Sequence, residues 1–208
     1  EIDHIYSRLR NAQFESSSIV GERRTGKSSM LKYMMLPEIR QKYGLPDRRC
    51  NFIFADLELL NSNTTPDKLW KDYLLPEMEA GVQIIEIKEK ISKLRNSSEV
   101  TNFSLDKLFS IIDSKELFII LLLDEFEAVT SNTNFGPDFF YGLRSLATRH
   151  NLSLITASKQ NLLNLCHSEA ISASPFFNIF TNVNIGLFDE AEANDLIRTS
   201  LGRTNIRF

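Results

Sequence analysis

Four residues near the start of the chain have the types and spacing of a phosphate-binding loop. Gly21, Gly26, Lys27 and Ser28 fit the pattern Gly-x-x-x-x-Gly-Lys-Ser. Glycines here let the backbone turn its N–H groups toward an anion, and the following helix adds the positive end of its dipole. A lysine and a serine at these positions reach nucleotide phosphates and Mg²⁺, respectively. The predicted phosphate-binding stretch comprises Gly21, Glu22, Arg23, Arg24, Thr25, Gly26, Lys27, Ser28 and Ser29.

Two carboxylates complete the chemistry that a phosphate loop requires. Asp124 and Glu125 directly follow the apolar run LFIILLL, residues 117–123. In open α/β sheets, ligands bind at the carboxyl ends of the strands, so this pair is placed to meet the loop. We predict that Asp124 and Ser28 hold Mg²⁺ and that Glu125 polarises the attacking water. The alternative is that the two acids only end the strand, and Glu127 is interpreted as a solvated residue.

Apolar runs and helix-period segments alternate along the chain. Residues 16–20, 50–60, 116–129, 151–158 and 182–188 are predicted strands. Helices are predicted between them and at both ends, and those within residues 62–115 form an insertion. This alternation favours an α/β fold with a parallel sheet and helices on both faces. The predicted helices cover residues 1–13, 27–44, 65–78, 82–94, 104–115 (capped by its serine), 137–150 and 189–202.

The composition is that of a globular domain and excludes several other classes. Hydrophobic residues make up 42% and charged residues 25% of 208 residues, and no apolar run reaches the roughly 18 residues of a membrane helix. The net charge of −3 argues against direct nucleic-acid binding by this segment. Cys50 and Cys166 are interpreted as free thiols in the cytoplasm. Because the chain begins with Glu1 rather than Met, we expect it to be part of a larger protein.

Four segments of the sequence together resemble the AAA-like ATPase domains of the STAND class (signal-transduction ATPases with numerous domains). They are SIVGERRTGKSSML, IILLLDEFEAV, FFYGLRSLATRHNLSLITAS and SPFFNIFTNVNIGLFDEAEANDLI. The resemblance extends to the additional-strand class of P-loop NTPases and to archaeal-type ATPases. It implies a five-stranded parallel sheet ordered 5-1-4-3-2 and binding of ATP or ADP. It also implies a nucleotide-binding domain over residues 1–188 and the start of a helical lid over 189–208.

The same resemblance makes residues 151–158 the central strand, whose end faces the γ-phosphate. Ser158 is the first choice for the residue that senses this phosphate, and Thr156 is the second. A hydroxyl that caps the next helix is the competing interpretation. Ring-forming relatives carry a catalytic arginine between the sensor strand and the fifth strand, but residues 159–181 contain none. Arg144 and Arg149 are possible substitutes, although a solvated role suits both.

These features predict an ATPase that acts as a switch. ATP binding would rearrange the lid and allow self-association, and slow hydrolysis would reset the protein. Sensor or effector domains of the same protein would be the downstream partners. One alternative is a DNA-directed ATPase of the replication-initiator or transposition type. Another is a nucleotide-binding scaffold that does not hydrolyse, against which the presence of Glu125 argues.

Overall fold

The computed structural model describes residues 1–11, 14–45, 49–188 and 190–194. A parallel sheet of five strands in the order β2-β3-β4-β1-β5 lies at its centre. This order is the predicted 5-1-4-3-2 read from the other edge, and it confirms the predicted fold class. The strands are β1 (Ser17–Val20), β2 (Cys50–Asp56), β3 (Phe118–Asp124), β4 (Leu152–Ser158) and β5 (Thr181–Asn184).

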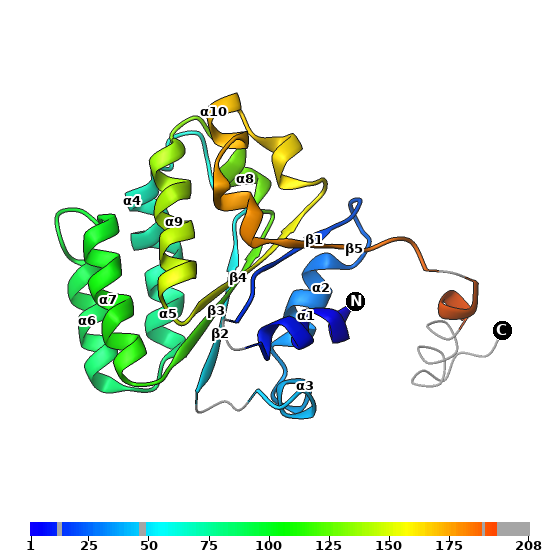
Figure 1. The fold of residues 1–208 in the computed structure, drawn as a ribbon, viewed down its shortest axis with the longest axis horizontal. Helices are drawn as coiled ribbons and strands as arrows, with labels where there is room; N and C mark the ends of the chain where they lie inside the picture. Colours follow the sequence, from blue (N-terminus) through cyan, green and yellow to red (C-terminus); the bar gives the residue numbers. More distant parts are fainter. Residues whose placement is uncertain (12–13, 46–48, 189, 195–208) are drawn as a thin grey trace.

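Helices cover both faces of the sheet (Figure 1). One face carries α1 (Ile2–Leu9), α2 (Lys27–Met34) and α3 (Pro37–Lys42). The other face carries the predicted insertion together with α9 (Pro137–Arg149). The insertion consists of α4 (Pro66–Lys68), the π-helix η1 (Leu69–Leu74), α5 (Leu75–Gly81), α6 (Ile85–Arg95) and α7 (Asn102–Ser114). The remaining short elements are α8 (Glu127–Thr130), η2 (Leu162–Leu165), α10 (Glu169–Ser172) and η3 (Pro175–Ile179).

Several predicted boundaries differ from the structure. The second and third strands end at Asp56 and Asp124, before the predicted residues 60 and 129. The helical stretch predicted over 65–78 runs from Pro66 to Gly81 and includes a π-helical turn before Pro76. The cap of α7 is Thr101 rather than Ser104, which occupies the third helical position of a capping box. The fifth strand stops at Asn184 instead of residue 188. Of the helix predicted over 189–202, residues 190–194 are helical, and the rest lies outside the described residues.

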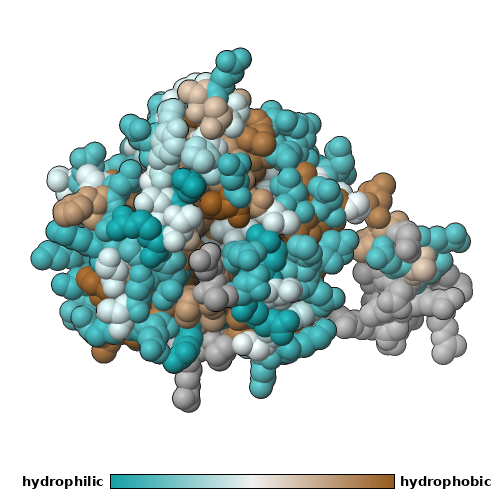
Figure 2. Space-filling model, viewed as in Figure 1, coloured by the Kyte–Doolittle hydropathy of each residue, from teal (hydrophilic) through white to brown (hydrophobic). Residues whose placement is uncertain are grey.

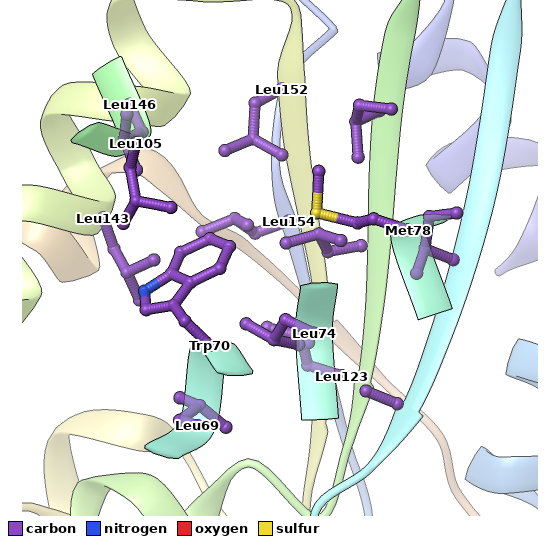
Figure 3. Close-up of a cluster of buried hydrophobic side chains, with 14 of the residues drawn as sticks. Leu69, Trp70, Leu74, Met78, Leu105, Leu123, Leu143, Leu146, Leu152 and Leu154 are labelled. Carbon is purple, nitrogen blue, oxygen red and sulfur yellow. The ribbon is translucent and has the colours of Figure 1, made fainter. Parts of the chain in front are cut away.

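Two apolar layers hold the sheet between its helices. On the insertion side, Trp70, Leu74 and Met78 pack against Leu123 and Leu154 of the sheet (Figure 3). On the other side, Leu31 and Met34 of α2 pack with Ile155 and Ala157 of β4. Burial of one large apolar side chain contributes about 1.5–3 kcal/mol. The strands that end at the predicted site are therefore held rigidly from both faces.

The outer surface is mainly polar. In the view of Figure 2, hydrophilic residues cover most of the surface, and hydrophobic ones show only in small separate patches. Within the described residues, no helix combines the length and the hydropathy needed to cross a bilayer. Neither cysteine forms a disulfide in the described part of the chain, as predicted, with Cys50 buried and Cys166 partly buried.

A buried histidine joins the insertion to the start of the central strand. His150 contacts Asp113 through Nδ1 at 2.7 Å and Asp106 through Nε2 at 3.0 Å, and its side chain is 5% exposed. Both carboxylates belong to α7, while His150 directly follows α9. The hydrogen bond from His150, followed by the charge of Arg149, lowers the pKa of Asp106. The contacts of His150 with Asp106 and Asp113 therefore fix α7 against the start of β4.

We expect Asp106→Asn to lower the melting temperature by a few degrees at pH 7. Because the pKa of Asp106 is lowered on folding, its ionised form stabilises the protein above the ordinary aspartate pKa. This contribution is lost as the pH falls through the lowered pKa, so the variant and the parent should converge in strong acid. Thermal unfolding at pH 7 and in acid measures both effects. The control is Asp72→Asn on the exposed side of η1, and an equal loss there would contradict the assignment.

Candidate nucleotide-binding site

The phosphate loop leaves β1 between two neighbouring strands. The amide of Gly21 donates to the carbonyl of Ser158 at 3.2 Å, and the amide of Ile185 donates to the carbonyl of Val20 at 2.7 Å. A Cβ on Gly21 would lie 2.6 Å from the carbonyl oxygen of Ile185 and 2.8 Å from Thr25 Oγ1. Glycine is therefore required here by close packing against the chain that follows β5.

The rest of the loop turns the backbone into α2. Arg24 and Gly26 have φ values of 68° and 92°, so both occupy the left-handed region. Thr25 closes the turn by donating its hydroxyl to the carbonyl of Glu22 at 2.9 Å. Gly26 is the N-cap of α2, whose first helical residue is Lys27. The helix therefore begins where the sequence predicts it, with its N-terminal amides next to the loop.

Lys27 lies inside this loop. Its side chain is buried, and Nζ donates to the carbonyls of Gly21 and Glu22, both at 2.9 Å. An ammonium group held on backbone carbonyls is already desolvated, and it can exchange these weak acceptors for phosphate oxygens of higher charge. The loop thus positions one positive charge at its centre.

The predicted carboxylates lie at the same edge of the sheet. Asp124 is the last residue of β3 and is 3% exposed, and its Oδ1 accepts the amide of Glu125 at 3.1 Å. Glu125 follows with a φ of 51°, an uncommon conformation for this residue type. Burial and then the charge of Glu127 raise the pKa of Glu125 above its usual range. Carboxyl groups with a raised pKa are common at functional sites.

A groove of about 450 Å³ is lined by the loop and by Glu125, whereas the buried Asp124 is not part of its lining. Glu125 shares this groove with Lys27 and Ser28, and its volume lies in the range of small-molecule sites. The groove contains most of the predicted loop and also Glu58, which the sequence analysis did not select. Its lining residues are Arg23, Arg24, Gly26, Lys27, Ser28, Ser29, Glu58 and Glu125.

Glu58 could have been found from the strand pattern. It lies two residues beyond β2, and its amide donates to Asp56 Oδ1 at 3.0 Å. Asp56 is the register partner of Asp124 on the neighbouring strand. The predicted strand over 50–60 already carried these acids near its carboxyl end, which is the edge where ligands bind.

The interpretation of Glu127 as a solvated residue is wrong. It begins α8, it is partly buried, and its Oε1 accepts the amide of Lys159 at 3.3 Å. The side chain therefore joins the turn after β3 to the turn after β4. The cause is that the chain turns sharply at Glu125, which carries Glu127 back toward β4. Periodicity could not reveal this turn.

The predicted sensor residues, Ser158 and Thr156, are buried and do not line the groove. Ser158 is fully buried, and its hydroxyl donates to the carbonyl of Gln160 at 2.7 Å, so it does not line the groove. Thr156 is also buried, and its Oγ1 has no hydrogen-bond partner within the described part of the chain. Ser158 is thus used in a local turn, but not as the cap of η2, which is Asn161.

The two arginines considered as substitutes are on α9. Arg149 is at the end of this helix, next to the amino end of β4, and it pairs with Asp106 at 2.9 Å. The phosphate loop is at the opposite edge of the sheet, so Arg149 cannot serve the site within one chain. Arg144 lies earlier on α9, about one turn closer to the phosphate loop than Arg149, and it is exposed.

The residues present suit a nucleotide with a metal ion. No group of three or more His, Cys, Asp or Glu side chains capable of holding a metal occurs in the described ranges. Mg²⁺ does not require such a cage, because it binds through one or two protein oxygens together with phosphates and water. Ser28, at the start of α2, and Asp124, at the end of β3, are oxygen donors of the required kind.

Solved structures with this fold are P-loop ATPases. ORC2 of Aeropyrum pernix, solved in ADPNP–ADP complexes, superposes with a TM-score of 0.65 at 13% identity, over 97% of this chain and 49% of that one. The Walker-type ATPase PABY2304 of Pyrococcus abyssi superposes with a TM-score of 0.60 at 16% identity, over 100% of this chain and 58% of that one. AMPPCP-bound DnaA of Aquifex aeolicus superposes with a TM-score of 0.56 at 17% identity, over 99% of this chain and 51% of that one. The chain thus spans about half the length of these neighbours.

Sequence comparison identifies the family. No curated protein matches the chain at the significance required. The family described as novel STAND NTPase 2 matches residues 11–207, which include the loop, both acids and all five strands. The chain therefore belongs to the novel STAND NTPase 2 family, as its resemblance to STAND ATPases predicted.

Proposed function

We propose that this chain binds ATP or ADP with Mg²⁺ and hydrolyses ATP slowly, as a switch within a larger protein. The observation that carries the proposal is the groove in which Glu125 meets Lys27 and Ser28. Membership of an NTPase family and the nucleotides named for the structural neighbours support it. The signalling role and nucleotide-dependent self-association extend this proposal, with sensor or effector domains of the same protein as partners.

The residues divide the work of phosphoryl transfer. The loop amides and Lys27 would bind and orient the phosphates, while Ser28 and Asp124 would hold Mg²⁺. When bound, Mg²⁺ supplies charge neutralisation between the phosphates. Glu125 would accept the proton of the attacking water, for which its raised pKa gives it useful basicity. Catalysis of this kind consists mainly of positioning and electrostatic stabilisation.

The overall charge favours a switch over a DNA-directed ATPase. The net charge is −3, whereas binding to DNA phosphates needs clustered Lys and Arg. The likeness to replication initiators extends to the fold of their ATPase core, at identities of 13–17%. DNA-stimulated turnover by the protein would reverse this preference.

Lys27→Ala tests the phosphate loop. The affinity for ATP and for ADP should each fall about 10-fold or more, because the variant loses a charge-assisted contact to the phosphates. Calorimetry with Mg²⁺ measures both affinities. The matched control is Lys93→Ala on the exposed side of α6, which should bind both nucleotides like the parent. Unchanged binding by Lys27→Ala would refute the assignment of the loop.

Glu125→Gln separates a catalyst from a scaffold. Loss of the general base should reduce the turnover number roughly 100-fold or more while ATP binding is retained. Phosphate release in single-turnover and steady-state assays measures the first effect, and calorimetry measures the second. Glu89→Gln on exposed α6 is the control. Equal phosphate release by Glu125→Gln and its parent would favour the non-hydrolysing scaffold.

The pH dependence of turnover reports the state of Glu125. Because its pKa is raised and only the ionised form accepts a proton, turnover should increase as the pH rises through that pKa. Removing the neighbouring charge with Glu127→Gln should lower the pKa of Glu125 and shift the rising limb to lower pH. The logarithm of the turnover number against pH gives both midpoints. A shift to higher pH would contradict this electrostatic account.

A further inference from the structure

A second cavity lies at the edge of the sheet opposite the phosphate loop. Its volume is about 330 Å³, at the lower end of the range of small-molecule sites. The residues that line it come from the segment before β1, the first residue of β3, the last turn of α9 and the residues between α9 and β4. The cavity shares no residue with the groove that contains Lys27 and Glu125, so it is a separate site.

The charged side chains in the lining of this cavity already have partners. Glu15 pairs with Arg8 at 2.7 Å. Both ring nitrogens of His150 contact carboxylates of α7, and Arg149 pairs with Asp106 at 2.9 Å. A strongly charged ligand would therefore lose its hydration without meeting an unpaired opposite charge among the described residues of the lining. A neutral polar group suits the interior of the cavity better than an ion.

Neutral hydrogen-bonding groups in the lining remain available. The side-chain amide of Asn151, with two donors and one acceptor, makes no hydrogen bond within the described part of the chain. Ser16 is 4% exposed, and its Oγ accepts the amide of Leu154 at 3.0 Å, which leaves the hydroxyl proton unused among the same residues. The carbonyls of the last turn of α9 also lack helical partners, because the helix ends at Arg149. The cavity thus presents both donors and acceptors.

Two aromatic rings supply a flat apolar surface beside these groups. Phe14 and Phe118 both line the cavity, and their rings stack with centroids 3.8 Å apart and an angle of 20° between the planes. Both residues are only partly buried, so part of the ring surface is accessible. Nucleobases stack on aromatic side chains, and an asparagine amide forms paired hydrogen bonds with the edge of a base. The combination of stacked rings, a free amide and a buried hydroxyl fits a planar heterocycle that carries donors and acceptors on its edge.

We propose that this cavity is a second ligand site, which binds the purine or pyrimidine base of a nucleoside or a nucleoside monophosphate. The base would stack on the pair of Phe14 and Phe118, and Asn151 and Ser16 would bond to its edge. The sugar would lie toward the opening, where the side chain of Arg149 is 61% exposed. The inference does not depend on the proposed function, since it requires neither the phosphate loop nor Mg²⁺.

The length of two strands separates this cavity from the phosphate groove. Ser16 directly precedes β1 and Asn151 directly precedes β4, whereas the opposite ends of these strands, Val20 and Ser158, adjoin the phosphate loop. Ligands at the two edges of the sheet therefore do not overlap. A base in the second cavity should remain bound when ADP and Mg²⁺ fill the groove, and this distinguishes it from a base that binds in the groove itself.

Calorimetry with adenosine, guanosine, cytidine, uridine and their 5′-monophosphates tests the inference. At least one of these ligands should bind the parent with a Kd below about 1 mM. Asn151→Ala should weaken that binding about 10-fold, because the base loses its paired hydrogen bonds. Phe14→Leu keeps an apolar side chain without a flat ring, and it should weaken binding about 5-fold or more. The matched control is Asn164→Ala in exposed η2, which should bind like the parent.

The monophosphates identify the source of the base. Tighter binding of a monophosphate than of its nucleoside indicates a nucleotide whose phosphate contacts Arg149, and equal binding indicates a nucleoside. Either result supports the site, provided that Asn151→Ala and Phe14→Leu weaken binding and melt within a few degrees of the parent.

Three results would overturn the inference. One is that no nucleoside or monophosphate binds the parent at millimolar concentration. Another is equal affinity in the parent, Asn151→Ala and Phe14→Leu, which would mean that the base binds elsewhere. The third is displacement of the nucleoside by ADP with Mg²⁺, which would place the base in the phosphate groove. Failure of ADP itself to bind would instead count against the proposed function, and the comparison of the two variants with the parent would still decide the second site.

Discussion

The amide of Gly21 donates to the carbonyl of Ser158, and the carbonyl of Val20 accepts the amide of Ile185. Through these bonds, the start of the phosphate loop is held between segments more than a hundred residues away in sequence. Because Gly21 has no side chain, the chain after β5 approaches to contact distance. Any residue with a Cβ would have to displace either that backbone or Thr25. The position of the whole loop relative to β4 and β5 depends on this close contact.

The rigidity of the site comes from the two apolar layers behind it. β3 is buried on both faces, with Leu121 and Leu123 in one layer and Ile120 and Leu122 in the other. A strand packed in this way cannot tilt or slide without opening cavities, which cost several kcal/mol for each large side chain lost from a contact. The end of β3 therefore presents Asp124 at a fixed place.

Much of this arrangement could be predicted because its signals are local. The loop pattern, the apolar run before Asp124 and the alternation of strands and helices are each written in consecutive residues, and they sufficed for the strand order. The strand pattern could have indicated Glu58, whereas the contacts of Glu127 depend on a turn between elements. Glu127 reaches Lys159 only because Glu125 adopts a φ of 51°, which no residue pattern specifies.

The assignment of Ser158 illustrates a second limit. Sequence patterns indicated that the carboxyl end of β4 lies beside the phosphate loop, and the hydrogen bond from the Gly21 amide to the Ser158 carbonyl agrees with this. The hydrogen bond that the Ser158 hydroxyl makes depends on the turn after the strand, which residue type does not specify. A hydroxyl residue at the end of a strand also fits local needs, and Ser158 meets one by bonding to Gln160. The choice of Ser158 as the sensor residue therefore stays a prediction.

The acids at this edge carry an energetic cost that relates stability to ligand binding. Asp124 is buried at the end of β3, and burial followed by the charge of Glu127 raises the pKa of Glu125 beside it, so negative charges gather where burial disfavours them. Lys27, which lies on the carbonyls of its own loop, is the buried positive charge beside them. A cation bound among these carboxylates would remove part of the repulsion in the folded state alone, and it would stabilise the fold by mass action. Without a ligand, this repulsion lowers the stability of the fold. Because a bound cation would relieve it, the stability of the fold and the binding of the cation are coupled.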